Sequence, residues 1–136
     1  MSKIRVIVKQ PFKELEVKEI ENTLTSLKEI VDGYIECVPF PRVNGVDLIV
    51  NEEGKLDRLD GNFYIPHYED CIVGNAIITS YNKDGEFISL NDDQIKQVSE
   101  YINHYKLERG QDIYEDLPLI RNKALSKMKR LESEME

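Results

Sequence analysis

Residues that bind metals or nucleotides are scarce in this chain. Its 136 residues include two cysteines and two histidines, and they form no Cys-x-x-Cys pair. A structural zinc site draws its four ligands from such residues, so we expect no metal ion and no other cofactor. The glycine patterns GxGxxG and GxxxxGK(S/T) are both missing. Their absence argues against the usual dinucleotide and P-loop phosphate sites.

A catalytic constellation is also missing. His67 lies close to Cys71 in the sequence, but this closeness does not place a thiol against an imidazole as a nucleophile requires. We expect His104 on the surface of a helix. Acids are so abundant that no pair stands out for hydrolysis. We therefore expect a protein that is not an enzyme and has no catalytic residue.

Long hydrophobic runs are absent as well. No apolar stretch approaches the roughly 20 residues of a membrane span, and the start MSKIRVIVKQPF lacks the layout of a signal peptide. We expect a cytoplasmic protein that does not enter the membrane. Cys37 and Cys71 each lie in an apolar stretch, and in that compartment we expect two buried free thiols without a disulfide.

Basic residues are outnumbered, and the formal net charge is -8. This sign opposes direct nucleic-acid binding, which needs Lys and Arg to displace phosphate counterions. Acids concentrate between residues 47 and 70, whereas basic residues concentrate between 121 and 130. Such an uneven distribution suits a protein partner better than a polyanion.

Hydrophobic periodicity predicts strands before residue 90. Ile4, Val6 and Val8 alternate with other residues, as in a strand. Pro39 indicates a strand at a sheet edge or a strand end, and Asn44-Gly45 and Asp84-Gly85 predict turns. Further strands are expected within 15–20, 34–40, 46–50, 74–81 and 86–90.

Helical signals appear once early and then in the last third of the chain. Residues 23–31 place Leu24, Leu27 and Val31 on one face, after a cap at Asn22 or Thr23 and before a closing Asp32-Gly33. Asn91 and Gln94 form a variant of the capping box, and Ile95, Val98, Ile102 and Tyr105 follow at helical spacing. This second helix is expected to end near Gly110, and a third is expected after Pro118.

These patterns predict an α+β fold, with a mainly antiparallel twisted sheet, one early helix and two C-terminal helices. Residues 1–110 would form the core domain, and residues 111–136 an amphipathic helix that packs on this core or dimerises. The helix has a short heptad seam, which is marginal alone and predicts a homodimer. The seam consists of Ala124, Met128, Leu131 and Met135.

The segment VNEEGKLDRLDGN, residues 50–62, admits three interpretations: a cation-binding loop, an acidic surface that faces a partner, or a hairpin turn. The calcium-loop template fails at both glycine turns, because Ile49 occupies its first position or Asn91 its twelfth. We favour a hairpin turn whose acids also suit an Arg- or Lys-rich partner. The candidate partner-binding residues are Glu52, Glu53, Asp57, Asp60, Tyr64, Tyr68, Glu69 and Asp70.

The stretches LKEIVDGYIECVPF, VDLIVNEEGKLDRLDGN, DCIVGNAIIT and DGEFISLNDDQI resemble an uncharacterised family, the domain of unknown function 3846. The resemblance covers about residues 3 to 104 and is specific in VNEEGKL. The chain departs from the family pattern in DRLDGN and in a shortened segment before DCIVG. The resemblance implies a small accessory protein of phages, plasmids or integrative elements in a bacterial cytoplasm, and it implies no activity.

Two functional hypotheses follow. The first is a non-enzymatic protein that binds a bacterial host protein and inhibits a defence system, of the anti-restriction or anti-CRISPR type. The second is a module that sequesters a small molecule or nucleotide in a pocket between the sheet and the last helix. The acidic segment favours the first hypothesis, and the C-terminal lysines favour the second.

Overall fold

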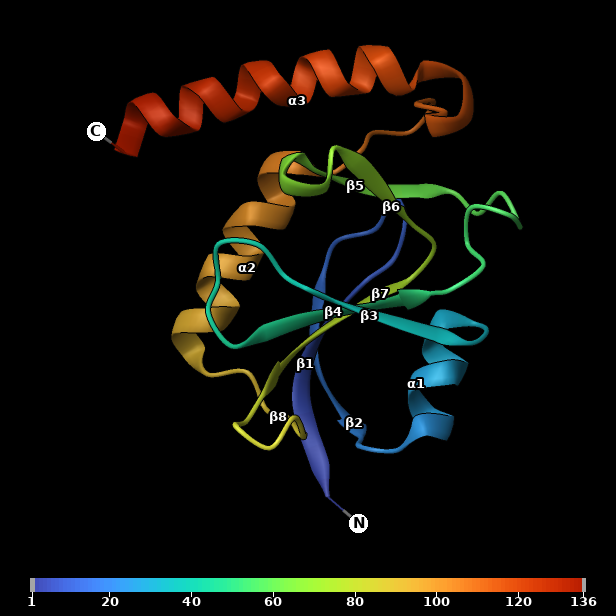
Figure 1. Ribbon diagram of the computed structural model, residues 1–136, viewed down its shortest axis with the longest axis vertical. Helices are drawn as coiled ribbons and strands as arrows, with labels where there is room; N and C mark the ends of the chain where they lie inside the picture. The colour runs from blue at the N-terminus through green and yellow to red at the C-terminus, as the bar shows by residue number, and fades with distance from the viewer. Residues whose placement is uncertain (1, 136) are drawn as a thin grey trace.

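Strands dominate residues 3 to 88 and helices dominate the remainder of the computed structural model (Figure 1). The structure describes the backbone of residues 2–135 and the side chains of residues 2–129. The elements in chain order are β1 (Lys3–Lys9), β2 (Glu16–Glu21), α1 (Leu24–Val31), β3 (Ile35–Pro39), β4 (Val46–Asn51), β5 (Gly61–Ile65), the 3₁₀ turn η1 (Pro66–Tyr68), β6 (Asp70–Val73), β7 (Ala76–Tyr81), β8 (Phe87–Ile88), α2 (Asp92–Tyr105) and α3 (Ile113–Met135).

The strands form two antiparallel sheets. The main sheet has the order β2-β1-β7-β4-β3, with the short β8 paired to β7. This confirms the predicted α+β fold, and the predicted edge strand at Pro39 is the edge strand β3. The second sheet, β5-β6, was not predicted. All five residues of β5 are buried, so this strand lacks the alternation that reveals a half-exposed strand.

Apolar residues cover both faces of the main sheet. Val6 and Val8 point toward α1 and join a cluster with Leu27 and Val31, whereas Ile7 points to the opposite face. On that opposite face a larger cluster gathers side chains from β5, α2 and α3, among them Phe63, Val98, Ile102, Ile120 and Ala124. Figure 1 shows α1 and α2 on opposite sides of the main sheet, and α3 across the end that holds β5 and β6.

Helix α1 is capped by Thr23, whose Oγ1 accepts a 3.1 Å hydrogen bond from the Ser26 amide. Leu27 and Val31 of the predicted apolar face are buried, whereas Leu24, at the start of the helix, is 55% exposed. The left-handed residue at the end of α1 is Asp32 with φ 61°. Gly33, expected to supply this conformation, has an extended φ of 159°.

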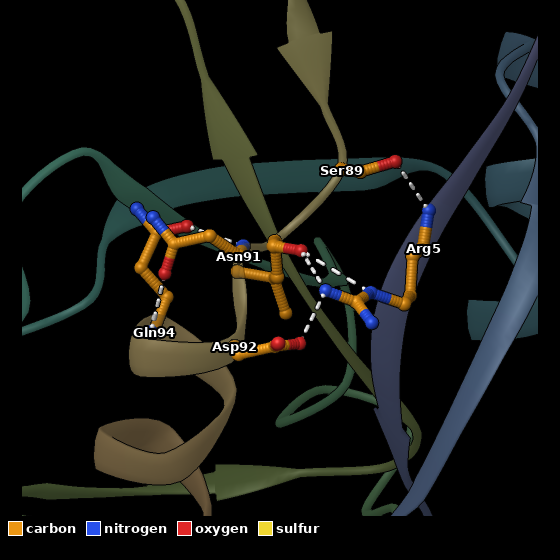
Figure 2. A network of polar contacts seen from close by, with 6 residues as sticks. Arg5, Ser89, Asn91, Asp92 and Gln94 are labelled. Atoms are coloured by element: carbon orange, nitrogen blue, oxygen red, sulfur yellow. Dashed lines mark hydrogen bonds and ion pairs between the residues drawn. The ribbon is translucent and has the colours of Figure 1, made fainter.

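The start of α2 is held by β1 (Figure 2). Asn91 and Gln94 form the predicted capping box, in which the backbone N–H of Gln94 donates to Asn91 Oδ1 at 2.7 Å. The Arg5 guanidinium donates to the Leu90 carbonyl at 3.0 Å and to Asp92 Oδ1 at 2.9 Å. Arg5 thus fixes the direction in which the chain enters the helix.

The ends of the two last helices differ from the prediction. α2 stops at Tyr105, because Lys106 turns to an extended conformation and bridges Phe63 of β5. Gly110, the expected end, lies in the following turn with φ 90°. α3 begins at Ile113, so Pro118 lies inside the helix, not before it. The Asp112 side chain accepts from the Tyr114 amide at 2.8 Å and caps this earlier start.

Candidate functional site

The acidic segment is a series of turns, not a hairpin. β4 pairs with β3 and β7, whereas β5 pairs with β6, so residues 52–60 connect the two sheets, with turns at 52–58. Asn51 anchors this connection: its Nδ2 donates to the carbonyl groups of Val31 and Asp32, and its Oδ1 accepts from the Glu53 amide at 2.8 Å. The hairpin interpretation was wrong, because alternation along the flanking sequence does not reveal which strands pair.

A close approach to β6 fixes the middle of this connection. A Cβ atom on Gly54 would lie 2.7 Å from Val73 Cγ2, so any larger residue there would force Val73 to shift. The packing leaves Glu52 and Glu53 exposed. It also leaves Leu56 83% exposed, the largest exposed fraction among the large apolar residues within 2–129.

The structure brings Glu52, Tyr68 and Asp70 together at a groove of about 260 Å³. The groove lies between the edge of the main sheet, strands β3 and β4, and the outer strand β6 of the second sheet. Apolar side chains form part of its lining, namely Val38, Val50 and Ile72. The charged lining residues are Glu36, Glu52, Lys55 and Asp70. We call this feature the acidic groove.

The charges of the acidic groove are only partly balanced. Lys55 Nζ lies 2.6 Å from Asp70 Oδ2, with both side chains about half exposed at 47% and 46%. Lys55 is the one basic residue among the lining residues, and it neutralises one of the three acids, Asp70. Within residues 2–129, no basic side chain forms an ion pair with Glu36 or Glu52. Their carboxylates therefore give the groove a negative potential.

Tyr68 links the groove to the sheet edge. Its hydroxyl donates a 2.6 Å hydrogen bond to the Pro39 carbonyl at the end of β3, and its side chain remains 38% exposed. Burial, followed by the nearby Asp47 carboxylate, raises the pKa of Tyr68. The ring is therefore a neutral donor and an aromatic contact surface at neutral pH.

The remaining predicted partner-binding residues lie elsewhere. Glu53, Asp57, Asp60 and Glu69 are exposed but do not line the acidic groove. Tyr64 is 1% exposed and belongs to the core cluster, so its side chain is not available to a partner at the surface. The sequence named two acids of the groove and missed Glu36, which lies on another strand and shows no local signal.

The two thiols differ in exposure. Cys71 is buried as expected, but Cys37 is exposed on β3, with Sγ 3.3 Å from Asp47 Oδ2. Burial raises the pKa of Cys71 to about 12. Partial burial, then the hydrogen bond to Asp47, raises the pKa of Cys37 to about 12 as well. Both groups are therefore thiols near neutral pH, whereas a nucleophile needs the thiolate.

The last two helices enclose a second, basic hollow of about 150 Å³. Lys106 enters it from the end of α2, and Lys123 and Lys127 enter it from successive turns of α3. The buried rings of Tyr64 and Tyr105 contribute to its lining. Charge counting in the sequence found the two lysines of α3 but not Lys106, which the end of α2 brings to them.

The predicted dimer seam points partly into the protein itself. Ala124 is 5% exposed and belongs to the core cluster, and Met128 packs against it. The side chains of Leu131 and Met135 lie outside the described residues. These two described seam positions are therefore occupied by contacts within one chain.

Two further properties concern the described part of the chain alone. Among side chains 2–129, no three His, Cys, Asp or Glu residues lie close enough together to hold a metal ion. None of the helices in the described range combines the length and apolar character that a membrane crossing requires.

Comparison with known proteins gives one match. A family model described as "Domain of unknown function (DUF3846)" matches residues 4–106, which extend from β1 to the residue after α2. The match includes every strand that lines the acidic groove and leaves α3 outside. No curated protein and no solved structure matches the chain.

Proposed function

We propose, from the premise that this chain belongs to the DUF3846 family, that it acts by binding a protein partner and carries out no chemistry of its own. The partner we propose is a bacterial host protein with a basic surface, such as a component of a defence system that the binding inhibits. The mobile-element setting implied by the family resemblance supports this choice of partner. The family match itself carries no activity.

The acidic groove is the observation that carries the proposal. It combines apolar residues with carboxylates that lack a basic partner in residues 2–129. Protein interfaces use such a combination, because the apolar part supplies affinity and the charges supply orientation and rate. Tyr68 lines the groove and offers an aromatic contact of the kind that often dominates binding energy. Leu56, the residue after the lining residue Lys55, is an exposed apolar side chain.

The test is affinity capture with three forms of the protein. The groove variant carries Glu36→Lys and Glu52→Lys, and the control carries Glu16→Lys and Glu19→Lys on the opposite edge strand, β2. All four positions are exposed, and both variants change the net charge equally. We expect a captured bacterial protein that the wild type and the control retain, that the groove variant loses, and that salt elutes.

Identical capture by all three forms would contradict the proposal, because a binding surface cannot be insensitive to reversal of its own charges. For a partner once purified, the groove variant should also slow association and reduce its salt dependence. The control should leave both quantities unchanged.

The basic hollow favours a second candidate, the binding of a small anionic ligand such as a nucleotide. Three lysines line this hollow in a protein whose net charge is -8. Lys106 Nζ lies 3.5 Å from Glu14 Oε1, and Glu108 is the one acid among the lining residues within 2–129. Such clustering raises the local concentration of anions. Titration with inorganic phosphate and with ATP would test it by calorimetry. Binding should disappear in Lys123→Glu with Lys127→Glu and persist in Lys83→Glu, whose lysine lies in the exposed turn after β7.

A further inference from the structure

The hydrogen-bond phase of β3 determines which of its backbone groups face outward. The Glu52 amide donates to the Tyr34 carbonyl at 2.8 Å, and the Phe40 amide donates to the Val46 carbonyl at 2.9 Å. Bonded and non-bonded pairs alternate along an antiparallel ladder. Glu36 and Val38, which share the parity of these pairs, therefore point their N–H and C=O groups toward β4. Those of Ile35 and Cys37 point away from the sheet.

The outward groups of β3 are open. In the part of the chain that the structure describes, no hydrogen bond fills the outward N–H or C=O of Ile35 or Cys37. The next outward carbonyl, that of Pro39, accepts from the Tyr68 hydroxyl and marks the end of the open stretch. Two successive outward-facing positions of β3 therefore have backbone groups to which a further strand could bond.

The opposite edge of the sheet is protected in a way that β3 is not. The Asn22 amide donates to the Ser2 carbonyl, which assigns the outward positions of β2 to Val17, Glu19 and Glu21. Four of the six residues of β2 are charged, whereas β3 carries one charge, Glu36. Charged side chains on an edge strand are a common means of preventing unwanted pairing.

The surroundings of β3 indicate the chemistry of the strand that would pair with it. Glu36 and Val38 face the acidic groove on one side of the strand. On the other side Cys37 contacts the Asp47 carboxylate. An added strand would therefore meet acids on both faces. A second copy of this chain would bring two acidic grooves together, so charge favours a basic partner segment over self-pairing.

We infer that β3 accepts an extended, basic segment of the protein partner as an additional strand of the main sheet. The inference rests on the proposed function and specifies its binding mode. Backbone bonds to Ile35 and Cys37 supply affinity, and side chains on one face of the segment enter the acidic groove. Basic residues of the segment meet Glu36 and Glu52.

The variant Cys37→Pro tests the backbone contact directly. The Cys37 amide does not bond to β4, so a proline there removes an outward donor without breaking the ladder, and proline is tolerated on edge strands. Its ring also obstructs an incoming strand. Cys37→Ser keeps the amide and serves as the matched control. Both proteins are first compared with the wild type by thermal melting and circular dichroism.

The probe is a random heptapeptide display library selected on the wild-type protein, followed by a synthetic copy of the selected peptide. We expect peptides rich in Lys or Arg that alternate with apolar residues. Cys37→Pro should weaken their binding by about tenfold or more, the effect of one or two lost hydrogen bonds and a clash, and Cys37→Ser should not. The bound peptide should slow hydrogen exchange at the Ile35 and Cys37 amides.

Each other outcome overturns the inference. Failure to select any peptide, selection of acidic peptides, or equal binding to Cys37→Pro would do so. If Cys37→Pro does not fold, two N-methylated forms of the selected peptide take its place in the test. One form is methylated at the odd-numbered backbone amides and the other at the even-numbered ones, so only one of them loses the amides that would face β3. Equal affinity of the two forms would contradict strand addition. A wild-type dimer that Cys37→Pro dissociates would identify a second copy as the occupant.

Loss of partner capture in the groove variant but not in Cys37→Pro would refute only the binding mode, whereas unaltered capture in both would refute the proposed function as well.

Discussion

Asn62 Oδ1 lies 3.0 Å from Lys9 Nζ, and this contact joins the two sheets through side chains that are 0% and 1% exposed. The side-chain Nδ2 of Asn62 also donates to the Lys9 carbonyl at 2.7 Å and to the Gly74 carbonyl at 2.8 Å. Lys9 Nζ completes the network by donating to the Gln10 carbonyl. The end of β1 and the turn before β7 are thus tied to β5 by one buried amide.

Replacement of Asn62 by leucine should destabilise the protein strongly. Leucine has a similar size but leaves a buried ammonium and two carbonyl groups without this partner, and each such loss costs about 1–3 kcal/mol. We expect the free energy of unfolding to fall by about 3 kcal/mol or more, measured by urea denaturation. Asn103→Leu, at an exposed position of α2, is the control and should change it by less than about 0.5 kcal/mol.

Lys9 should make stability depend on pH in the alkaline range. Burial, then the nearby charge of Lys106, lowers the pKa of Lys9 from 10.5 to about 8, against an opposing effect of Glu14. Between these two values the unfolded chain holds more protons than the folded one, so the contribution of Lys9 to stability rises with pH. The gain from pH 8 to 10.5 should be on the order of 2 kcal/mol.

Comparison with Lys9→Met isolates this effect from other groups. The two thiols and the buried Tyr101 titrate in the same range with the opposite sign, because their raised pKa values favour the protonated folded state. The difference in unfolding free energy, wild type minus Lys9→Met, should therefore grow as the pH rises. A difference that stays constant from pH 7 to 10.5 would show that the Lys9 pKa is not lowered.

Patterns confined to a short stretch of sequence predicted the fold well. The cap of α1, expected at Asn22 or Thr23 and found at Thr23, the Asn91–Gln94 box and the alternation of β1 are local, and each is present. The misassigned features depend on distant partners. The end of α2 is set by pairing of Lys106 with β5, and the acidic segment is not a hairpin because β5 pairs with β6.

The candidate site was predicted only in part for the same reason. Charge density identified Glu52 and Asp70, but the groove also needs Glu36 and Val38 from β3, and strand order cannot be read from periodicity. Tyr64 was placed at the surface because acids surround it in the sequence, whereas α2 and α3 cover it in the fold.

Removal of the α2 cap should have a modest effect. Asn91→Ala deletes the acceptor for the Gln94 amide (Figure 2) and should reduce the free energy of unfolding by about 1 kcal/mol. Asp93→Ala, in the same turn, removes a dipole interaction and an exposed 3.2 Å hydrogen bond from Gln97 Nε2 but no cap, and should cost about 0.3–1 kcal/mol at low salt. Added salt should distinguish the two variants. It screens the interaction of Asp93 with the helix dipole, so the cost of Asp93→Ala should shrink, whereas the cost of Asn91→Ala should remain.

The α3 helix should prove essential to folding although it lies beyond the family match. Ile120 is 3% exposed within the core cluster, whereas its neighbour Leu119 is 55% exposed. Ile120→Asp would bury a carboxylate in the core cluster. The lysines that line the basic hollow beside Ile120 offset only part of the desolvation cost. We therefore expect a loss of about 3 kcal/mol or more, or outright unfolding, measured by urea denaturation and circular dichroism. Leu119→Asp makes the same chemical change on the exposed face and should alter the free energy of unfolding by less than about 1 kcal/mol.

Sedimentation of the same two variants distinguishes packing within one chain from dimerisation through α3. If α3 serves mainly to pair two copies, Ile120→Asp should give a folded monomer with an intact circular dichroism spectrum, because residues 4–106 would then fold without it. If α3 completes the core, as the burial of Ile120 and Ala124 implies, the variant should lose cooperative unfolding at any protein concentration. A concentration-dependent melting temperature in the wild type, abolished by Leu119→Asp, would instead place a contact between copies on the outer face of α3.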